Sequence, residues 1–100
     1  MHKVILSGNA HQDLAKTVRR YEDISTNLAN RFLDDFDVAI DRLEQNPNLC
    51  SIYEDHFRFV KLKNFPYVLI FRFIPDALEV LTVKHSSQND DFWRERITSS

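Results

Sequence analysis

The sequence predicts one α+β domain over residues 1–100, in the order β-α-α-β-β-β-α, with an antiparallel sheet and a helical hairpin packed on one of its faces. Apolar residues recur at helical spacing in the first half, whereas β-branched and aromatic runs dominate after about residue 50. A chain of 100 residues, 43% of them hydrophobic, suits a single core. Helices that precede a run of antiparallel strands are typical of the α+β class.

The first half is expected to contain a short strand and two helices. Residues 2–7 favour a strand, and Ser7 begins a Ser-Gly-Asn break that can cap a helix starting near Ala10. Residues 25–27 form a second break, and Pro47 ends the second helix because proline cannot continue the hydrogen-bond ladder. The apolar stripes consist of Leu14, Val18 and Tyr21 on the first helix, and Leu28, Phe32, Phe36, Ala39, Ile40 and Leu43 on the second.

The second half is expected to form a meander and a last short helix. Residues 57–63, 66–74 and 78–84 show no helical stripe and read as three antiparallel strands. Pro75 suits the second position of a type I turn between the last two strands. Asn89 can begin a terminal helix, whose apolar residues would be Phe92, Trp93 and Ile97.

Side-chain alternation in the strand 66–74 explains a basic residue within an apolar run. Tyr67, Leu69, Phe71 and Phe73 share one face, and Arg72 lies on the other. If the aromatic-rich face packs on the helices, Arg72 emerges on the open face of the sheet.

Charge is distributed unevenly along the chain. The net charge is −2 and the pI about 6.0, which argues against a surface that coats nucleic acid. Residues 56–75 nevertheless contain no acid. The candidate binding residues are Arg58, Lys61, Lys63, Arg72 and Lys84, which could bind phosphate or an acidic protein segment, or could simply keep the sheet soluble.

Candidates for catalysis are few. His85 ends a strand, where an imidazole could move protons, although a packed histidine is the simpler interpretation. The catalytic candidates are Arg58, Arg72 and His85. Cys50 has no histidine at a meaningful spacing, which disfavours a nucleophile, and it is the only cysteine, which excludes an intrachain disulfide.

No metal or cofactor is expected, and the chain is expected to be cytoplasmic. The four histidines, His2, His11, His56 and His85, do not show the spacing of metal ligands. Near the N-terminus only Val4-Ile5-Leu6 is strongly apolar, which is too short for a secretion signal or a membrane span.

The order of elements and several short stretches resemble the RelE/ParE toxin family of bacterial type II toxin–antitoxin systems. The resemblance runs from about Val4 to Ile97 and includes NFPYVLIFRFIPDALEVLTVKH followed by DDFWRERI. The residues that match ParE-like members in type are Arg58, Phe65-Pro66-Tyr67, His85, Trp93 and Arg96. Between His85 and the last helix, family members usually carry basic residues and a proline, whereas this chain has Ser86 to Asp90.

The resemblance implies a toxin that binds a cognate antitoxin in a toxin–antitoxin hetero-oligomer. ParE-like members inhibit DNA gyrase, and the Phe65-Pro66-Tyr67 triplet favours that activity. RelE-like members act on the ribosome as metal-independent mRNA endoribonucleases, with basic side chains around the reacting phosphate. The Ser86–Asp90 stretch contains no basic residue, which disfavours that alternative, so we expect little mRNA cleavage. A third alternative is a degenerate, non-toxic relative that still binds its antitoxin.

Overall fold

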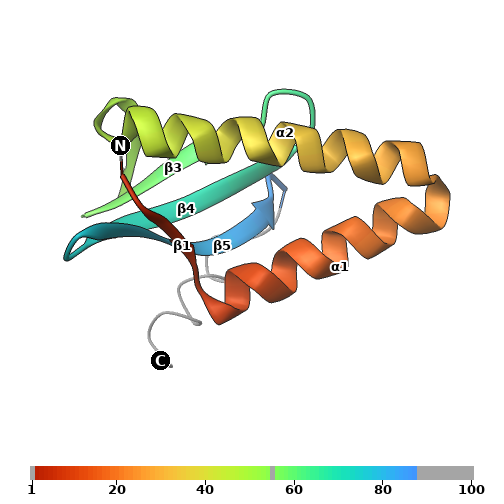
Figure 1. The fold of residues 1–100 in the computed structure, drawn as a ribbon, viewed down its shortest axis with the longest axis horizontal. Helices are drawn as coiled ribbons and strands as arrows, with labels where there is room; N and C mark the ends of the chain where they lie inside the picture. Colours follow the sequence, from red (N-terminus) through yellow and green to blue (C-terminus); the bar gives the residue numbers. More distant parts are fainter. Residues whose placement is uncertain (1, 55, 88–100) are drawn as a thin grey trace.

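Two helices cover one face of a five-stranded sheet in the computed structural model, which describes residues 2–54 and 56–87 (Figure 1). The strand order is β1-β5-β4-β3-β2. The elements are β1 (Val4–Leu6), α1 (Gly8–Ile24), α2 (Thr26–Gln45), the short 3-10 helix η1 (Pro47–Leu49), β2 (Ser51–Glu54), β3 (Phe57–Lys61), β4 (Tyr67–Ile74) and β5 (Ala77–His85). The α+β class is thereby confirmed. The predicted helix after Asn89 lies outside the described residues.

Serine caps fix both helix starts where the sequence predicts breaks. The Ser7 hydroxyl accepts a hydrogen bond from the Ala10 N–H (3.1 Å), and the Ser25 hydroxyl accepts one from the Leu28 N–H (3.0 Å). Ser25 also donates its backbone N–H to the Tyr21 carbonyl (2.9 Å). One residue therefore ends α1 and begins α2, which makes the hairpin tight at this end.

The sheet is antiparallel from β2 to β5, and β1 adds a parallel edge. The predicted meander of β3, β4 and β5 is confirmed by their antiparallel pairing. The sequence did not show which partner the first strand takes. It lies parallel to β5, with Val4 opposite Leu78, so the complete sheet is mixed. β2 was not predicted, because four residues depend on pairing with β3 rather than on local propensity.

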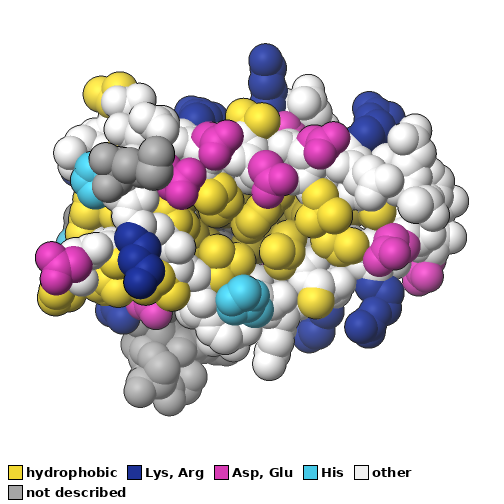
Figure 2. Space-filling model, viewed as in Figure 1, with side chains coloured by type: hydrophobic (Ala, Val, Ile, Leu, Met, Phe, Trp, Pro, Cys, Tyr) yellow, Lys and Arg dark blue, Asp and Glu magenta, His cyan; other side chains and the backbone are white. Residues whose placement is uncertain are grey.

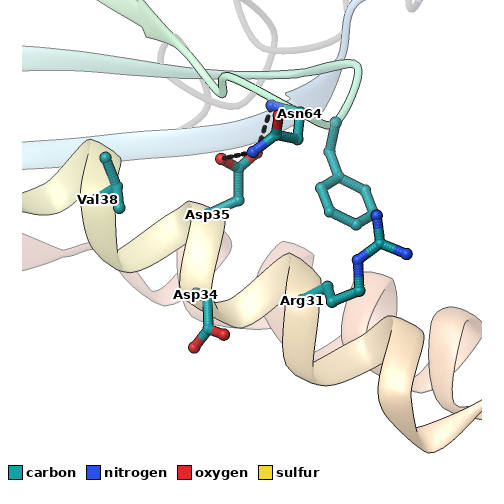
Figure 3. Close-up of a pocket in the computed structure, with 6 residues that line it drawn as sticks. Arg31, Asp34, Asp35, Val38 and Asn64 are labelled. Atoms are coloured by element: carbon teal, nitrogen blue, oxygen red, sulfur yellow. Dashed lines mark hydrogen bonds between the residues drawn. The ribbon is translucent and has the colours of Figure 1, made fainter.

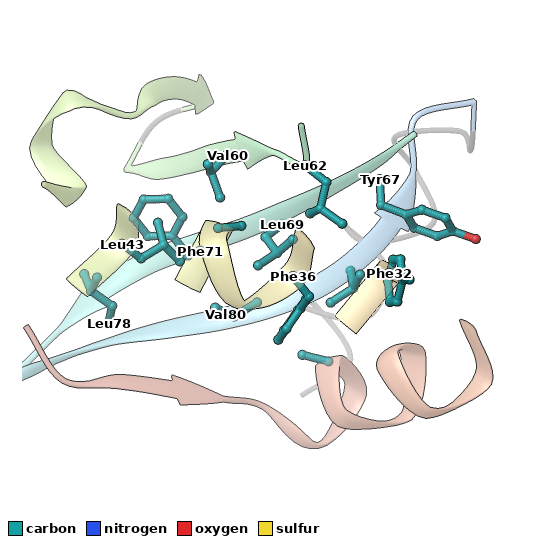
Figure 4. Close-up of a cluster of buried hydrophobic side chains, with 13 residues drawn as sticks. Phe32, Phe36, Leu43, Val60, Leu62, Tyr67, Leu69, Phe71, Leu78 and Val80 are labelled. Atoms are coloured by element: carbon teal, nitrogen blue, oxygen red, sulfur yellow. The ribbon is translucent and has the colours of Figure 1, made fainter. Parts of the chain in front are cut away.

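The aromatic-rich side of β4 packs against the helices, as the alternation predicts (Figure 4). Tyr67, Leu69 and Phe71 are buried in one cluster with Phe32 and Phe36 of α2. Phe73 is 41% exposed, because it lies near the end of the strand. On the other face, Val68 and Ile70 are buried with Tyr53, Phe57 and Phe59 packed around them.

Beyond the end of β1, the edge of β5 is hydrogen-bonded by a side chain of α1. A bulge shifts the register there, since Ile70 pairs with Thr82 but Phe71 pairs with Val80. The Asp13 carboxylate accepts hydrogen bonds from the Thr82 hydroxyl (2.8 Å) and the Val83 N–H (3.2 Å). A helix side chain thus satisfies an edge amide that β1 does not reach.

The turn between β4 and β5 differs from the predicted type. Asp76 has φ 64°, which lies in the left-handed region, whereas type I requires a negative φ at that position. A positive φ at the third residue is a feature of type II turns, and aspartate tolerates it better than most residues.

Candidate functional site

One flank of α2 forms a groove with β3 and with the loop that follows β3; we call it the α2/β3 groove. It consists of three adjoining hollows of about 250, 440 and 300 Å³. The first two share Asp35 and Val38, and the last two share Arg42 and Lys61, so the groove is continuous. It runs from Phe65 at one end to Leu49 at the other.

Helical periodicity places two arginines on this flank. Arg31, Asp35, Val38 and Arg42 recur at spacings of four, three and four residues, which puts them on one side of α2. Arg31 extends toward the loop that carries Asn64 (Figure 3). The sequence analysis missed both arginines because it followed the acid-free stretch alone. The helical spacing of Arg31 and Arg42 relative to Asp35 could have shown that these residues share one side of the helix.

Asp35 holds the loop after β3 against the helix (Figure 3). The side chain is 5% exposed, and its two oxygens accept hydrogen bonds from the Asn64 N–H (2.8 Å) and the Asn64 side-chain amide (3.2 Å). A buried carboxylate requires such partners. The backbone of Asn64, which follows Lys63 in the chain, is therefore tied to α2.

The far end of β3 leaves part of a strand edge beside the groove. β2 pairs with β3 only as far as Phe59, and β3 continues to Lys61. Arg42 donates from Nη1 to the Lys61 carbonyl at 3.5 Å, which is a long hydrogen bond. Lys61 and Lys63 are exposed. Lys61 lies opposite Val68, so its side chain leaves the sheet on the face away from the helices. The groove thus offers arginines of α2 beside the Lys61 carbonyl.

The structure brings only some of the predicted binding residues together. Lys61 and Lys63 line the groove. Arg58 donates to the carbonyls of Cys50 (2.8 Å) and Asn48 (3.3 Å), so it holds the segment between η1 and β2. Arg72 forms an ion pair with Glu79 (2.9 Å) on the face of the sheet opposite the helices. Lys84 is 5% exposed.

The catalytic candidates are likewise separated. His85 lies opposite Tyr67 in the β4–β5 ladder, whereas Arg72 lies opposite Glu79. Five strand positions separate Tyr67 from Arg72, which corresponds to about 16 Å. Arg58 lies opposite Phe71, so its side chain is on the face that Arg72 does not share. These three residues do not form one site.

Local contacts define the environment of His85. Its Nδ1 accepts a hydrogen bond from the Ser87 N–H (3.1 Å), and the Ser87 hydroxyl lies 2.7 Å from the same nitrogen. The imidazole packs edge-on against Tyr67, with ring centroids 5.2 Å apart. This arrangement is consistent with a packed histidine.

The remaining chemistry is limited. Burial raises the pKa of the Cys50 thiol above its ordinary value, although Arg42 and Arg58 oppose that effect. The thiol is thus protonated at neutral pH, which disfavours a nucleophile. Among residues 2–54 and 56–87, no group of His, Cys, Asp and Glu side chains could hold a metal ion. Neither described helix is long and apolar enough to cross a membrane.

Comparisons with known proteins found a matching family model, similar toxins and a solved structure with a similar fold. A family model described as the ParE toxin of the type II toxin–antitoxin system parDE matches residues 4–90. The chain is 28% identical over 78 residues to Toxin ParE2 from two strains of Mycobacterium tuberculosis, CDC 1551 / Oshkosh and H37Rv, covering 77% of this chain and 74% of each relative. A solved structure of the chromosomal ParDE TA system from P. aeruginosa superposes with a TM-score of 0.74 at 19% identity, covering 85% of this chain and 96% of the other.

Proposed function

Because the chain belongs to the ParE toxin family of type II toxin–antitoxin systems, we propose that a cognate antitoxin neutralises it and that it acts as a ParE-like inhibitor of DNA gyrase. The family match over residues 4–90 is the observation that carries this proposal. The resulting assembly would be a toxin–antitoxin hetero-oligomer.

The antitoxin segment is proposed to be acidic and to occupy the α2/β3 groove. Arg31, Arg42 and Lys63 supply positive charge along its length, and Lys61 lies at its edge on the outer face of the sheet. Asp34 is the exposed acid among its lining residues. The Lys61 carbonyl accepts a long, 3.5 Å hydrogen bond from Arg42 and is an acceptor that an extended segment could use. Val38 is 50% exposed on the same flank and offers apolar contact.

Charge reversal tests the location of that segment. The double variant Lys61→Glu/Lys63→Glu should weaken the complex with the antitoxin at least about ten-fold at low salt and flatten its salt dependence. Lys16→Glu/Arg19→Glu is the matched control, since both residues are exposed on α1 and away from the groove. Titration calorimetry at two salt concentrations measures both. An equal loss in the control, or none in the groove variant, would place the segment elsewhere.

A second experiment tests the activity. Gyrase inhibition is favoured over mRNA cleavage by the separation of Arg72 from His85, because stabilising a transferring phosphoryl group requires converging charges. Inducible expression without the antitoxin should arrest growth, and purified protein should block gyrase supercoiling while leaving mRNA intact in a ribosome-programmed assay.

Each alternative activity predicts a different result in these assays. Efficient mRNA cleavage that is lost in His85→Ala or Arg72→Ala would favour a ribosome-dependent endoribonuclease. If antitoxin binding persists without growth arrest, gyrase inhibition or cleavage, the chain is a degenerate relative.

A further inference from the structure

The opposite flank of α2 faces α1 and carries an apolar band. Figure 2 shows hydrophobic side chains gathered between the two helices, with acidic side chains along one border. We define the α1/α2 band as Leu14 and Val18 of α1 with Leu33 and Ile40 of α2; all four are half-buried. Leu14, Val18 and Ile40 pack against the core. The helices are joined at one end and diverge from it (Figure 1).

The α2 border of the band is acidic. On α2, Leu33, Asp37, Ile40 and Glu44 recur at spacings of four, three and four residues and therefore share the side that faces α1. On α1, Glu22 follows Val18 by one helical turn. His11 lies on the same side of α1 as Glu22, and the His2 N–H donates to the Glu44 carbonyl, which places Lys3 near that end of α2. The α2 border is thus negative, whereas the α1 border carries His11 together with Glu22. The α2/β3 groove, by contrast, has several cations.

We propose that the α1/α2 band binds a cationic amphipathic helix of a partner protein. Charge complementarity selects a segment with Lys or Arg beside its apolar stripe. Both walls are helices whose backbone groups are bonded internally, so an extended segment would find no main-chain partners there. A helix satisfies its own backbone and can place an apolar stripe on Leu14, Val18 and Ile40.

The size of the band limits the length of that helix. From Leu33 to Glu44 the α2 axis advances about 16 Å, which equals about three helical turns. A partner stripe of three or four apolar residues at i, i+4, i+7 and i+11 would match this length. This surface lies on the other side of α2 from the groove proposed for the antitoxin, so the two ligands can bind together.

Designed peptides test the proposal on the whole protein. One helical peptide of about 18 residues carries a Leu stripe flanked by Lys; a second replaces each Lys by Glu; a third keeps the Lys composition but scrambles the stripe. Only the first should bind, and amide chemical shifts should change around Leu14, Val18 and Ile40. Equal binding of the Glu or scrambled peptide, or shifts confined to the α2/β3 groove, would overturn the proposal.

Variants of the protein complete the test. Asp37→Lys/Glu44→Lys should weaken the Lys peptide about ten-fold, whereas Asp23→Lys, exposed on the outer side of α1, should change affinity less than two-fold. Binding of the antitoxin should be unchanged in both, so failure here is distinguishable from failure of the proposed function. Concentration-dependent dimerisation that Asp37→Lys/Glu44→Lys abolishes would instead assign the band to a second copy of the chain, and would also overturn the proposal.

Discussion

The two flanks of α2 differ in charge, in burial and in what they offer a ligand. The flank toward β3 presents Arg31 and Arg42 beside a strand edge, and the loop anchored by Asp35 closes it at one end. The flank toward α1 presents apolar side chains between acids such as Asp37 and offers no free backbone. One helix therefore separates two surfaces that suit opposite partner charges.

Both flanks border the same buried stripe of α2. Their different character therefore arises from the elements that lie beside them. Phe32, Phe36 and Leu43 point into the core between the flanks (Figure 4). A sheet edge on one side supplies carbonyls, which attract arginine and bind extended segments. On the other side lies α1, which offers a ligand only side chains. The apolar residues between α1 and α2 remain half-buried. Helical spacing alone distributes the charges between the two environments.

The largest expected effect comes from removing the shared core. Phe32 is 0% exposed and packs against Phe65 and Tyr67, with ring centroids 5.3 and 5.5 Å apart. Phe32→Ala should lower the free energy of unfolding by about 3–5 kcal/mol and weaken both ligands together. Urea unfolding measures this, and Val38→Ala, on the exposed flank, is the control. A loss below about 1 kcal/mol would show that the stripe does not support both flanks.

A smaller effect is expected from releasing the loop that closes the groove. Asp35→Ala leaves the Asn64 N–H without its partner and should cost about 1–3 kcal/mol. Antitoxin binding should weaken as the loop that carries Lys63 is released from α2, while the Lys peptide should bind the α1/α2 band as before. The exposed neighbour Asp34→Ala should have almost no effect on unfolding. If Asp35→Ala weakens both ligands equally, the flanks are not independent.

Measuring both ligands on both charge-reversal variants tests whether the two flanks are separate sites. Lys61→Glu/Lys63→Glu should reduce antitoxin affinity only, and Asp37→Lys/Glu44→Lys should reduce affinity for the Lys peptide only, each about ten-fold. Both variants change exposed or half-buried side chains, so unfolding should shift by about 0.5 kcal/mol or less. Calorimetry with each ligand on each variant completes the cycle. Cross-effects of similar size would contradict two separate sites.

The smallest effect concerns Cys50 as a reporter in the α2/β3 groove. Its pKa lies above the ordinary 9.0 because of burial, so alkylation by iodoacetamide should be slow at pH 8 and should accelerate as pH rises past 9. The antitoxin should slow the reaction severalfold, whereas the Lys peptide should not. Protection by the peptide alone would show that it binds in the wrong groove.

The sequence by itself determined the class and most of the elements. Serine caps at Ser7 and Ser25, the stop at Pro47 and the change of period near residue 50 are local signals, and local signals are readable without tertiary contacts. Side-chain alternation also placed Tyr67, Leu69 and Phe71 on the core face. The resemblance, which runs from about Val4 to Ile97, agrees with the family whose model matches residues 4–90.

Only the tertiary structure decided how the charges are grouped. Register between strands and the approach of α2 to β3 depend on contacts between residues distant in the chain. The acid-free stretch therefore separated into Lys61 and Lys63 in the groove, Arg58 on backbone carbonyls and Arg72 on Glu79. The stripe of α1 was predicted to be buried, but its Leu14 and Val18 remain half-buried. Local periodicity determines which face of a helix or strand a residue occupies. Tertiary packing determines which residues contact it on that face.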